Sequence, residues 1–200
     1  MTRQDLDPAD LGIGIYPWLN SVVVPRPIAW VSTRSATGVD NLAPHSFFTV
    51  AGIDPPVVSF TSVGEKDTLR NVRSTREFVV CLSTEPLADQ VNATATDFPG
   101  EVSEFDAVGV TREPALRVVP PRVAESPVAI ECRFVDERTF GTCTVVFGEV
   151  VHLAVDTAVL EDGRPEIRLL RPVSRLGADE WATIGDVTDR RRVPFSELSA

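Results

Sequence analysis

The sequence has few of the residues that build metal centres and disulfide frameworks. Its 200 residues include three cysteines, two histidines and one methionine. Cys81, Cys132 and Cys143 lie in apolar, strand-like segments without C-x-x-C spacing, so neither a zinc site nor a disulfide framework is expected. We predict reduced, buried thiols that pack as small apolar groups. His45 and His152 are too few for most histidine-based metal sites, and we expect catalysis to depend on neither.

Positive charge and long apolar runs are also scarce. Lys and Arg number 19 against 29 Asp and Glu, which gives a formal net charge of -10. Such a surface repels phosphate backbones and anionic lipids at long range, so nucleic acid and membrane are not expected partners. No apolar run approaches the roughly 20 residues that span a bilayer. The first residues lack the apolar core of a signal peptide, and we expect a cytoplasmic protein.

Common catalytic and cofactor motifs are missing as well. Gly12-Ile13-Gly14 begins like a dinucleotide-binding loop, but Pro17 occupies the third glycine position and no strand precedes it. The sequence contains no P-loop, no H-E-x-x-H and no G-x-S-x-G. A bound organic cofactor is therefore the natural carrier of any chemistry, and the protein would bind and orient it.

What the sequence does contain indicates one mainly β domain. Its hydrophobic content of 43% is enough for one substantial core, and we assign a single domain to residues 1–200 with its core at about 16–181. Apolar and polar residues alternate in two segments, as in half-buried antiparallel strands, with Gly141 between them. The predicted strands are these two, Val128–Phe134 and Val145–Val155, and three β-branched segments, Ile28–Arg34, Pro56–Val63 and Glu77–Ser83.

Helices are expected to be few, short and peripheral. Asp67 is a good N-cap for a helix over Thr68–Thr75, and a second helix is predicted over Leu87–Ala95. A loop from Arg171 is expected to lead to a third, short helix near Glu180–Ala182. Many strands, few helices and sixteen prolines favour a closed or partly closed antiparallel barrel over a parallel sheet.

The start of the first predicted helix is a candidate anion site. The backbone N–H groups of a first helical turn lack partners within the helix, and the helix dipole favours negative charge there. Lys66 adds a positive charge and Thr68 a hydroxyl, and Asn71 lies one turn further on the same face. A phosphate group would fit this pattern, although a capped surface helix has the same sequence signature.

Polar groups before this helix suit a flavin ring. Asn41 and Ser46 flank Ala43-Pro44, where we expect the strand to break because proline has no N–H. Free backbone groups there can satisfy the alternating donors and acceptors of a flavin's pyrimidine edge. An ordinary loop is the alternative, and Phe47-Phe48 is expected in the core. Ser32 and Thr33 either point hydroxyls at the ring or end an edge strand guarded by prolines.

Together these segments resemble one known family. They occur in its order and at about its spacing, from Tyr16 to Trp181. The segments are Pro25-Arg26-Pro27 with Trp30-Val31-Ser32-Thr33, Asn41 to Phe48, Lys66-Asp67-Thr68 with Asn71, Glu77-Phe78-Val79-Val80, and Arg171-Pro172 with Arg175-Leu176-Gly177. The family is the FMN-binding split-barrel flavin reductases.

The resemblance implies a fold, a cofactor and a set of site residues. The implied fold is a six-stranded antiparallel Greek-key split β-barrel with a few short peripheral helices, which forms a homodimer and binds FMN near the subunit interface. Ser32 and Thr33 would lie along the isoalloxazine, and Asn41, Ala43 and Ser46 would face the ring or the ribityl chain. The phosphate would be held by Ser62, Lys66, Thr68 and Asn71. Arg171 and Arg175 would close the site or form ion pairs with the acidic surface.

The implied activity is an NAD(P)H-dependent FMN reductase, with a partner monooxygenase as one destination for the reduced flavin. Two alternatives stay open. One is a split-barrel flavoprotein that keeps FMN tightly bound and acts on another substrate. The other is a non-enzymatic FMN carrier or sensor. The residues do not distinguish NADH from NADPH, because no group can be assigned to the nucleotide ribose without the fold.

Overall fold

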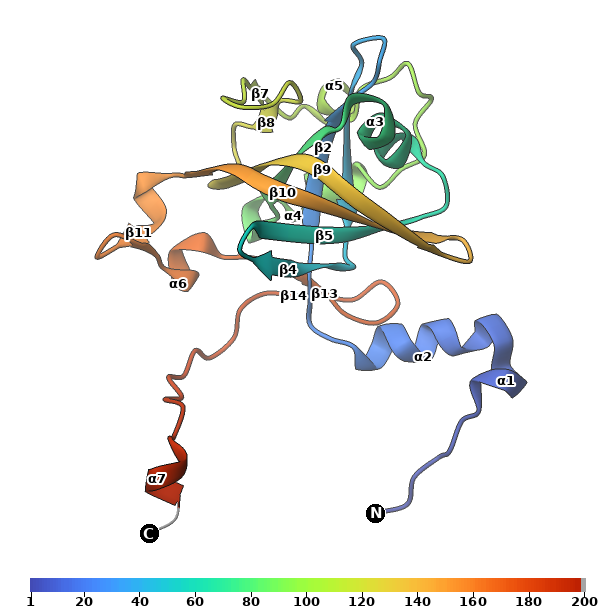
Figure 1. Ribbon diagram of the computed structural model, residues 1–200, viewed down its shortest axis with the longest axis vertical. Coiled ribbons are helices and arrows are strands. Elements are labelled where there is room, and N and C mark those ends of the chain that lie inside the picture. The colour runs from blue at the N-terminus through green and yellow to red at the C-terminus, as the bar shows by residue number, and fades with distance from the viewer. Residues whose placement is uncertain (199–200) are drawn as a thin grey trace.

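The computed structural model describes residues 1–198, in which one seven-stranded antiparallel sheet forms the body of the molecule (Figure 1). The strands follow the order β3(Asp40–His45), β2(Ala29–Arg34), β6(Glu77–Leu82), β9(Val128–Phe140), β10(Cys143–Val155), β5(Pro56–Val63) and β4(Phe48–Ile53). Within the described chain the end strands β3 and β4 do not pair, so the sheet is not closed. The mainly β fold is confirmed, but the six strands implied by the family resemblance are wrong. β3 continues past the break that was expected at Pro44, and β4 was not predicted from the sequence.

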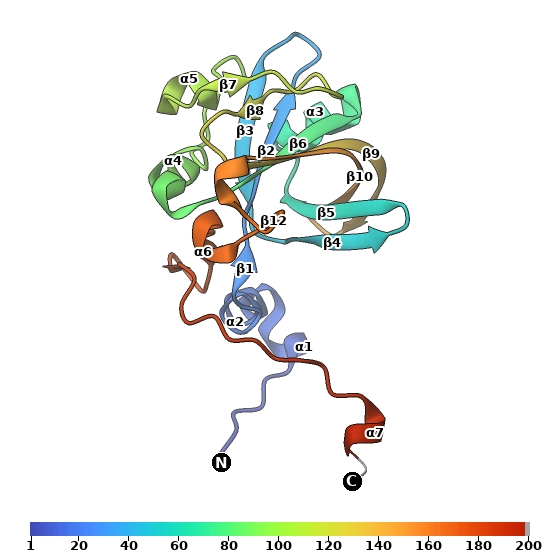
Figure 2. The same ribbon diagram turned by 90° about the vertical axis from the view of Figure 1, so that its left-hand side faces the viewer.

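The long hairpin of β9 and β10 gives the sheet its curvature, as the two views show (Figure 1 and Figure 2). Both predicted alternating segments are confirmed, but each strand extends to 13 residues around a turn at Gly141, where φ is 59°. The pairing shifts register between Phe147 and Gly148. At Gly148 an added Cβ would lie 2.3 Å from Cζ of Phe78. Only glycine therefore lets β10 pass over this ring.

Pro44 does not end a strand as predicted. β3 continues through it to His45, and Pro44 pairs with Trp30 of β2. The missing N–H is tolerated because β3 is the edge strand of the sheet, where one side of the backbone needs no ladder partner. A tight turn joins β2 to β3, closed by the bond from Ser35 N to Val39 O, 2.8 Å long.

The helices are short, as expected, but their details differ from the prediction, and one expected helix is a strand. α3(Asp67–Thr75) buries Leu69 and Val72 as predicted, but its N-cap is Lys66 rather than Asp67. The second predicted helix is divided into η2(Glu85–Leu87) and α4(Ala88–Ala93). The helix expected near residue 180 is wrong, because Trp181–Ala182 form β14 instead. This strand joins a small sheet in the order β1(Arg26–Pro27), β13(Ser174–Arg175), β14.

Two apolar clusters lie on the two faces of β2. One contains Trp30, Leu42 and Phe105, and the other contains Phe60 and Phe78. β2 is therefore buried on both faces, so that even its polar residues Ser32 and Thr33 are fully buried. The free thiols of Cys81 and Cys132 are buried as predicted, and Cys143 is half-buried. Burial raises the pKa of the Cys81 thiol to about 12.

The remaining elements cover the edges or extend from the body. They are α1(Pro8–Leu11), η1(Gly12–Gly14), α2(Ile15–Val22), α5(Glu104–Val108), β7(Arg112–Glu113), β8(Arg122–Val123), η3(Thr157–Val159), β11(Leu160–Glu161), β12(Arg164–Pro165), α6(Ile167–Leu170) and α7(Phe195–Leu198). α1, α2 and α7 lie outside the barrel body, as does the N-terminus (Figure 1 and Figure 2). None of the helices formed by residues 1–198 is long and apolar enough to cross a membrane.

Candidate functional site

Three adjoining cavities follow the end of β3 within the described residues. The helix-start cavity, of about 350 Å³, lies between β3, the start of α3, and residues 94–98. The Ser62 cavity, of about 190 Å³, lies between Tyr16, residues 44–47 and β5. The Arg175 cavity, also about 190 Å³, lies between β3, α4 and the small sheet. Pro44 lines all three cavities, so together they form one groove along this strand end.

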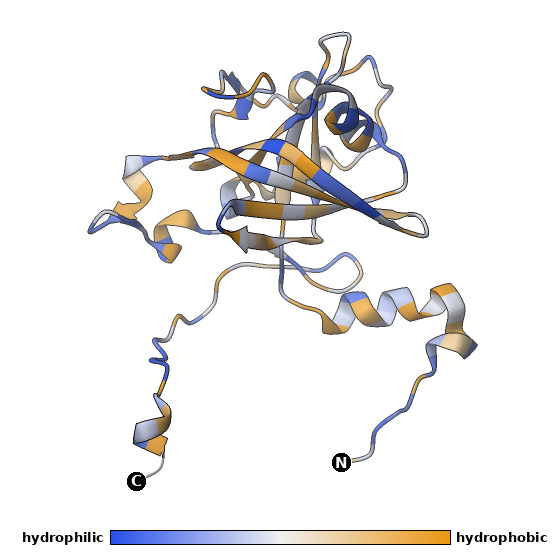
Figure 3. Cartoon of the chain, in the orientation of Figure 1, coloured by the Kyte–Doolittle hydropathy of each residue, from blue (hydrophilic) through white to orange (hydrophobic). Residues whose placement is uncertain are grey.

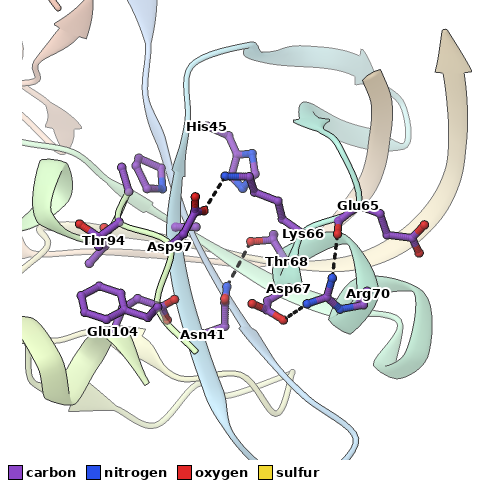
Figure 4. Close-up of a pocket in the computed structure, with 15 residues that line it drawn as sticks. Asn41, His45, Glu65, Lys66, Asp67, Thr68, Arg70, Thr94, Asp97 and Glu104 are labelled. Atoms are coloured by element: carbon purple, nitrogen blue, oxygen red, sulfur yellow. Dashed lines mark hydrogen bonds and ion pairs between the residues drawn. The ribbon is translucent and has the colours of Figure 1, made fainter. Parts of the chain in front are cut away.

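The start of α3 supplies positive potential to the helix-start cavity. No side chain within residues 1–198 caps this helix start, so its first N–H groups are available to a ligand. The Lys66 ammonium forms an ion pair with Asp97 across the cavity, 2.9 Å long (Figure 4). The Lys66 side chain is 60% exposed and that of Asp97 is 87% exposed. Such an exposed pair contributes little stability, and a bound anion could replace Asp97 as the partner of Lys66.

Two amide-to-hydroxyl hydrogen bonds link β2, β3 and α3. Asn41 Nδ2 donates to Thr68 Oγ1 and Asn71 Nδ2 donates to Thr33 Oγ1, each at 3.1 Å. The first bond is drawn in Figure 4. All four residues are buried. Because each hydroxyl accepts a bond from an amide, its own O–H remains free to donate. The structure thus brings together four predicted site residues, with Thr68 and Asn41 lining the cavity.

Ser32 and Thr33 are farther from the groove than the sequence suggested. Consecutive residues of a strand point to opposite faces, so the two hydroxyls do not share one face of β2. Both residues are fully buried, and neither lines the three cavities. Within the described chain Ser32 Oγ is buried without a hydrogen-bond partner, and its role at a ring stays a prediction.

The other predicted residues are distributed along the groove. Ala43 lines the helix-start cavity, and Ser46 lines both smaller cavities. Ser62 lines its own cavity and donates to Gly64 O at 2.9 Å. Arg175 lines the third cavity, which shares Pro44 and Ala95 with the helix-start cavity. Arg171 lies elsewhere and pairs with Glu85 at 2.9 Å, which is the ion-pair alternative considered from the sequence.

Glu104 is a site residue that the sequence reasoning missed. It is the first residue of α5, is 7% exposed and lines the helix-start cavity. Its Oε2 accepts a hydrogen bond from Leu42 N at 2.9 Å. Burial raises the pKa of this carboxyl group above its ordinary value. The pattern Ser103-Glu104 is typical of a helix start, but no local signal shows that α5 packs against β3.

His45 presents an unusual ring to the same groove. It lines the helix-start and Ser62 cavities, and its Nδ1 lies 3.1 Å from Thr61 O. A carbonyl oxygen only accepts, so Nδ1 carries the proton of the neutral ring. In the described structure Nε2 is buried without a partner. Burial lowers the pKa of His45 to about 4, and the Lys66 charge acts in the same direction, so the ring is neutral at pH 7.

Comparisons with known proteins give one family match and several proteins of similar fold or sequence. A family model described as a flavin reductase like domain matches residues 21–170. Nitrilotriacetate monooxygenase component B from Bacillus cereus is 29% identical with a TM-score of 0.91, covering 95% of this chain and 100% of that one. The 2-nitrobenzoate 2-nitroreductase of Pseudomonas fluorescens is 30% identical with a TM-score of 0.88, covering 96% and 97%. An uncharacterized protein of Aquifex aeolicus (strain VF5) is 37% identical over 172 residues, covering 83% and 88%.

The family match covers the part of the chain that builds the groove. Residues 21–170 include all seven strands of the main sheet, α3 and α5, whereas Arg175 and Trp181 of the third cavity lie beyond them. The resemblance inferred from the sequence motifs is therefore confirmed, although the motif at residues 171–177 lies beyond the family match, and this chain belongs to the flavin reductase-like family.

Proposed function

We propose that this protein is an FMN-dependent flavin reductase that uses NADH or NADPH. The observation that carries the proposal is the uncapped start of α3, which lies at one end of a groove that follows the β3 end. A helix start favours an anion, and a strand end offers backbone donors and acceptors. A ligand with a terminal phosphate and a polar ring matches both parts.

The residues present fit FMN. At the phosphate end, Lys66 offers a charge and Thr68 offers the O–H that its bond with Asn41 leaves free. The helix-start cavity alone, of about 350 Å³, lies within the usual size range of ligand sites, roughly 300–1,000 Å³. The volumes of the two adjoining cavities add to it. Ser46, Ala43 and Ser62 line the rest of the groove. The unpartnered His45 Nε2 is a buried polar atom of a residue that lines the groove, and a ligand contact there would offset the cost of its burial.

We propose that the side chains of the groove bind and orient the ligand, and that the Glu104 carboxyl serves the fold by accepting the Leu42 N–H. FMN, when bound, would supply the redox chemistry by accepting a hydride from the nicotinamide. His45 holds its one proton against Thr61 O and remains neutral at pH 7. We therefore propose that no single general acid or base is essential, and that the groove's task is to hold two rings within reach of each other.

Two relatives favour different destinations for the electrons. The 29% identical neighbour is named as the component B of a monooxygenase, which supports a partner enzyme that uses reduced flavin. The 30% identical neighbour is named as a nitroreductase, which supports the alternative of FMN that stays bound and acts on another substrate. A carrier or sensor without enzymatic activity is the third candidate.

Anaerobic reduction distinguishes these candidates. We expect added FMN to lose fluorescence on binding, and NADH or NADPH to bleach the visible absorbance of the bound flavin rapidly. If FMN binds but neither nicotinamide bleaches it, the protein is one of the two alternatives. If FMN fluorescence is unchanged by excess protein, the cofactor assignment itself fails.

We also propose a homodimer. α2 buries none of its residues in the described chain, although it contains Tyr16, Trp18, Leu19 and Val22. Figure 3 shows this helix as a partly apolar rod away from the barrel body. Exposed apolar surface of this extent is typical of an interaction site. A second copy of the chain would cover α2 and deepen the groove, whose Ser62 cavity Tyr16 already lines.

A further inference from the structure

The Arg175 cavity differs from the other two in composition. Its walls include the apolar groups Ile28, Pro44 and Trp181, and its polar groups include Ser46 and Arg175. The helix-start cavity, in contrast, is lined by charged side chains of both signs from residues 65–70 and by Glu104. The third cavity therefore combines flat apolar walls with one cation.

Arg175 is held in place by its own strand pair. It lies opposite Trp181 in the β13–β14 register, and its guanidinium carbon is 5.6 Å from the centre of the Trp181 ring. Nη2 donates to Ala178 O at 2.7 Å in the turn between the strands. Ala178 has a φ of 45°, an uncommon conformation for a residue with a side chain. The turn therefore fixes the guanidinium beside the indole before any ligand arrives.

The charges around this cavity favour an anion despite the acidic chain. The register partner of Arg175 in the small sheet, Arg26, does not line the cavity and donates its guanidinium to the carbonyls of Asn20 and Leu176. Arg175 therefore supplies the positive charge. The carboxylate that approaches Arg175 is Asp179, at 3.3 Å, and its side chain is fully exposed. An exposed pair of this kind is screened by water and contributes little. Arg175 is thus available to a better-placed carboxylate.

Size limits the ligand to a small molecule. The cavity volume of about 190 Å³ is below the roughly 300–1,000 Å³ that drug-sized ligands occupy. It suits one ring with a short substituent rather than a dinucleotide. Trp181 offers a platform for stacking, and a planar guanidinium matches the two oxygens of a carboxylate.

We propose that the Arg175 cavity binds a single-ring aromatic carboxylate next to the flavin groove. The proposal rests on the proposed function in one respect, since the molecule would lie beside FMN across Pro44, which lines both cavities. Arg175 then recognises this second ligand rather than FMN itself. Trp181 and Ile28 provide the apolar contacts, and the carboxylate pairs with Arg175.

Benzoate is the probe, tested on protein with and without FMN. We expect benzoate to quench tryptophan fluorescence in the FMN-free protein and to shift the visible flavin spectrum in the FMN-loaded protein. Arg175→Met should weaken benzoate binding by about ten- to a hundredfold, the usual effect of losing a charged hydrogen bond. Arg175→Lys should retain part of the affinity. Arg168→Met removes an exposed arginine that pairs with Glu166 outside this cavity and should leave binding unchanged.

Uncharged and non-aromatic analogues separate the two halves of the site. Benzamide should bind more weakly than benzoate if the charge matters, and acetate more weakly if the ring matters. Equal affinity for benzoate and either analogue would overturn the proposal. So would an FMN-loaded protein whose flavin spectrum does not change when benzoate is added. A protein that binds benzoate through Arg175 but does not bind FMN would support this site and refute the proposed function instead.

Discussion

Thr68 serves the fold and the proposed ligand with different atoms of one hydroxyl. Its oxygen accepts a hydrogen bond from Asn41 Nδ2 at 3.1 Å, which ties α3 to β3. The hydroxyl proton remains available for an acceptor in the cavity. Thr33 repeats this arrangement with Asn71 one strand away. Sequence reasoning placed all four side chains at the phosphate or ring, whereas the structure indicates that the two amides primarily hold the two hydroxyls.

If Thr68 and Lys66 hold the phosphate, replacing either residue should lower the affinity for FMN. Thr68→Val keeps the shape but removes the hydroxyl, and Lys66→Met removes the charge at the exposed helix start. Each should weaken FMN binding by about ten- to a hundredfold, since a hydrogen bond to a charged group contributes about 1.5–3 kcal/mol. Fluorescence titration measures both, and Thr68→Ser is the control that should bind FMN nearly as the natural protein does. Unchanged affinity in the double variant would refute the phosphate site.

The lowered pKa of His45 predicts that the folded protein is less stable in acid. Its pKa in the folded protein is about 4, below the ordinary value of 6.5, so the unfolded chain takes up the proton first. The free energy of unfolding should therefore fall as the pH drops below 6.5, until the pH passes the folded-state value near 4. A shift of this size corresponds to at most about 3 kcal/mol.

Urea unfolding at pH 7.5 and pH 4.5 tests this expectation. His45→Gln keeps a donor for Thr61 O but cannot take up a proton, so the difference between the two pH values should shrink. His152→Gln is the matched replacement at the other histidine and should keep the difference of the natural protein. The explanation fails if His45→Gln shows the same loss of stability in acid as the natural protein.

At the scale of elements, the sequence predicted those strands and helices that are determined by the pattern of neighbouring residues. Alternation located β9 and β10, β-branched runs located β2, β5 and β6, and the stripe of Leu69 and Val72 located α3. β3 was missed because its proline is acceptable only at a sheet edge, and edge position depends on the whole topology. β14 and the place of Glu104 were missed for the same reason, since both depend on packing between segments distant in the chain.

The close approach of the long hairpin to Phe78 at Gly148 can be tested by adding a Cβ at this position. A Cβ at this position would approach Phe78 Cζ to 2.3 Å and Cys132 Cβ to 3.1 Å, so Gly148→Ala must displace a fully buried ring. We expect a loss of about 1–3 kcal/mol, as is usual for overpacked cores, measured by chemical unfolding. Gly185→Ala is the control, because a Cβ there meets nothing within 4 Å. Equal stability of the two variants would mean that the sheet can relax around Phe78.

At the scale of the whole molecule, α2 carries a group of exposed apolar side chains outside the barrel. Leu19 is 51% exposed and Val22 is 69% exposed on α2, and the eight-residue helix is too short to be stable alone in water. Arg26 holds its end, since Nη1 donates to the carbonyl of Asn20 and Nη2 to that of Leu176. These hydrogen bonds fix the orientation of α2 relative to the barrel, so its exposed face is already positioned for a partner.

The homodimer proposal predicts that charge on α2 separates the subunits and weakens cofactor binding together. Light scattering should give twice the chain mass of 21.8 kDa for the natural protein and a lower mass for Leu19→Glu with Val22→Glu. FMN affinity should fall in the same variant, because α2 carries Tyr16 into the Ser62 cavity and the partner would cover the groove. Val102→Glu introduces the same charge at an exposed valine far along the chain and should change neither measurement. A natural protein that is monomeric and still holds FMN would show that one subunit completes the groove and that α2 receives something other than a second copy.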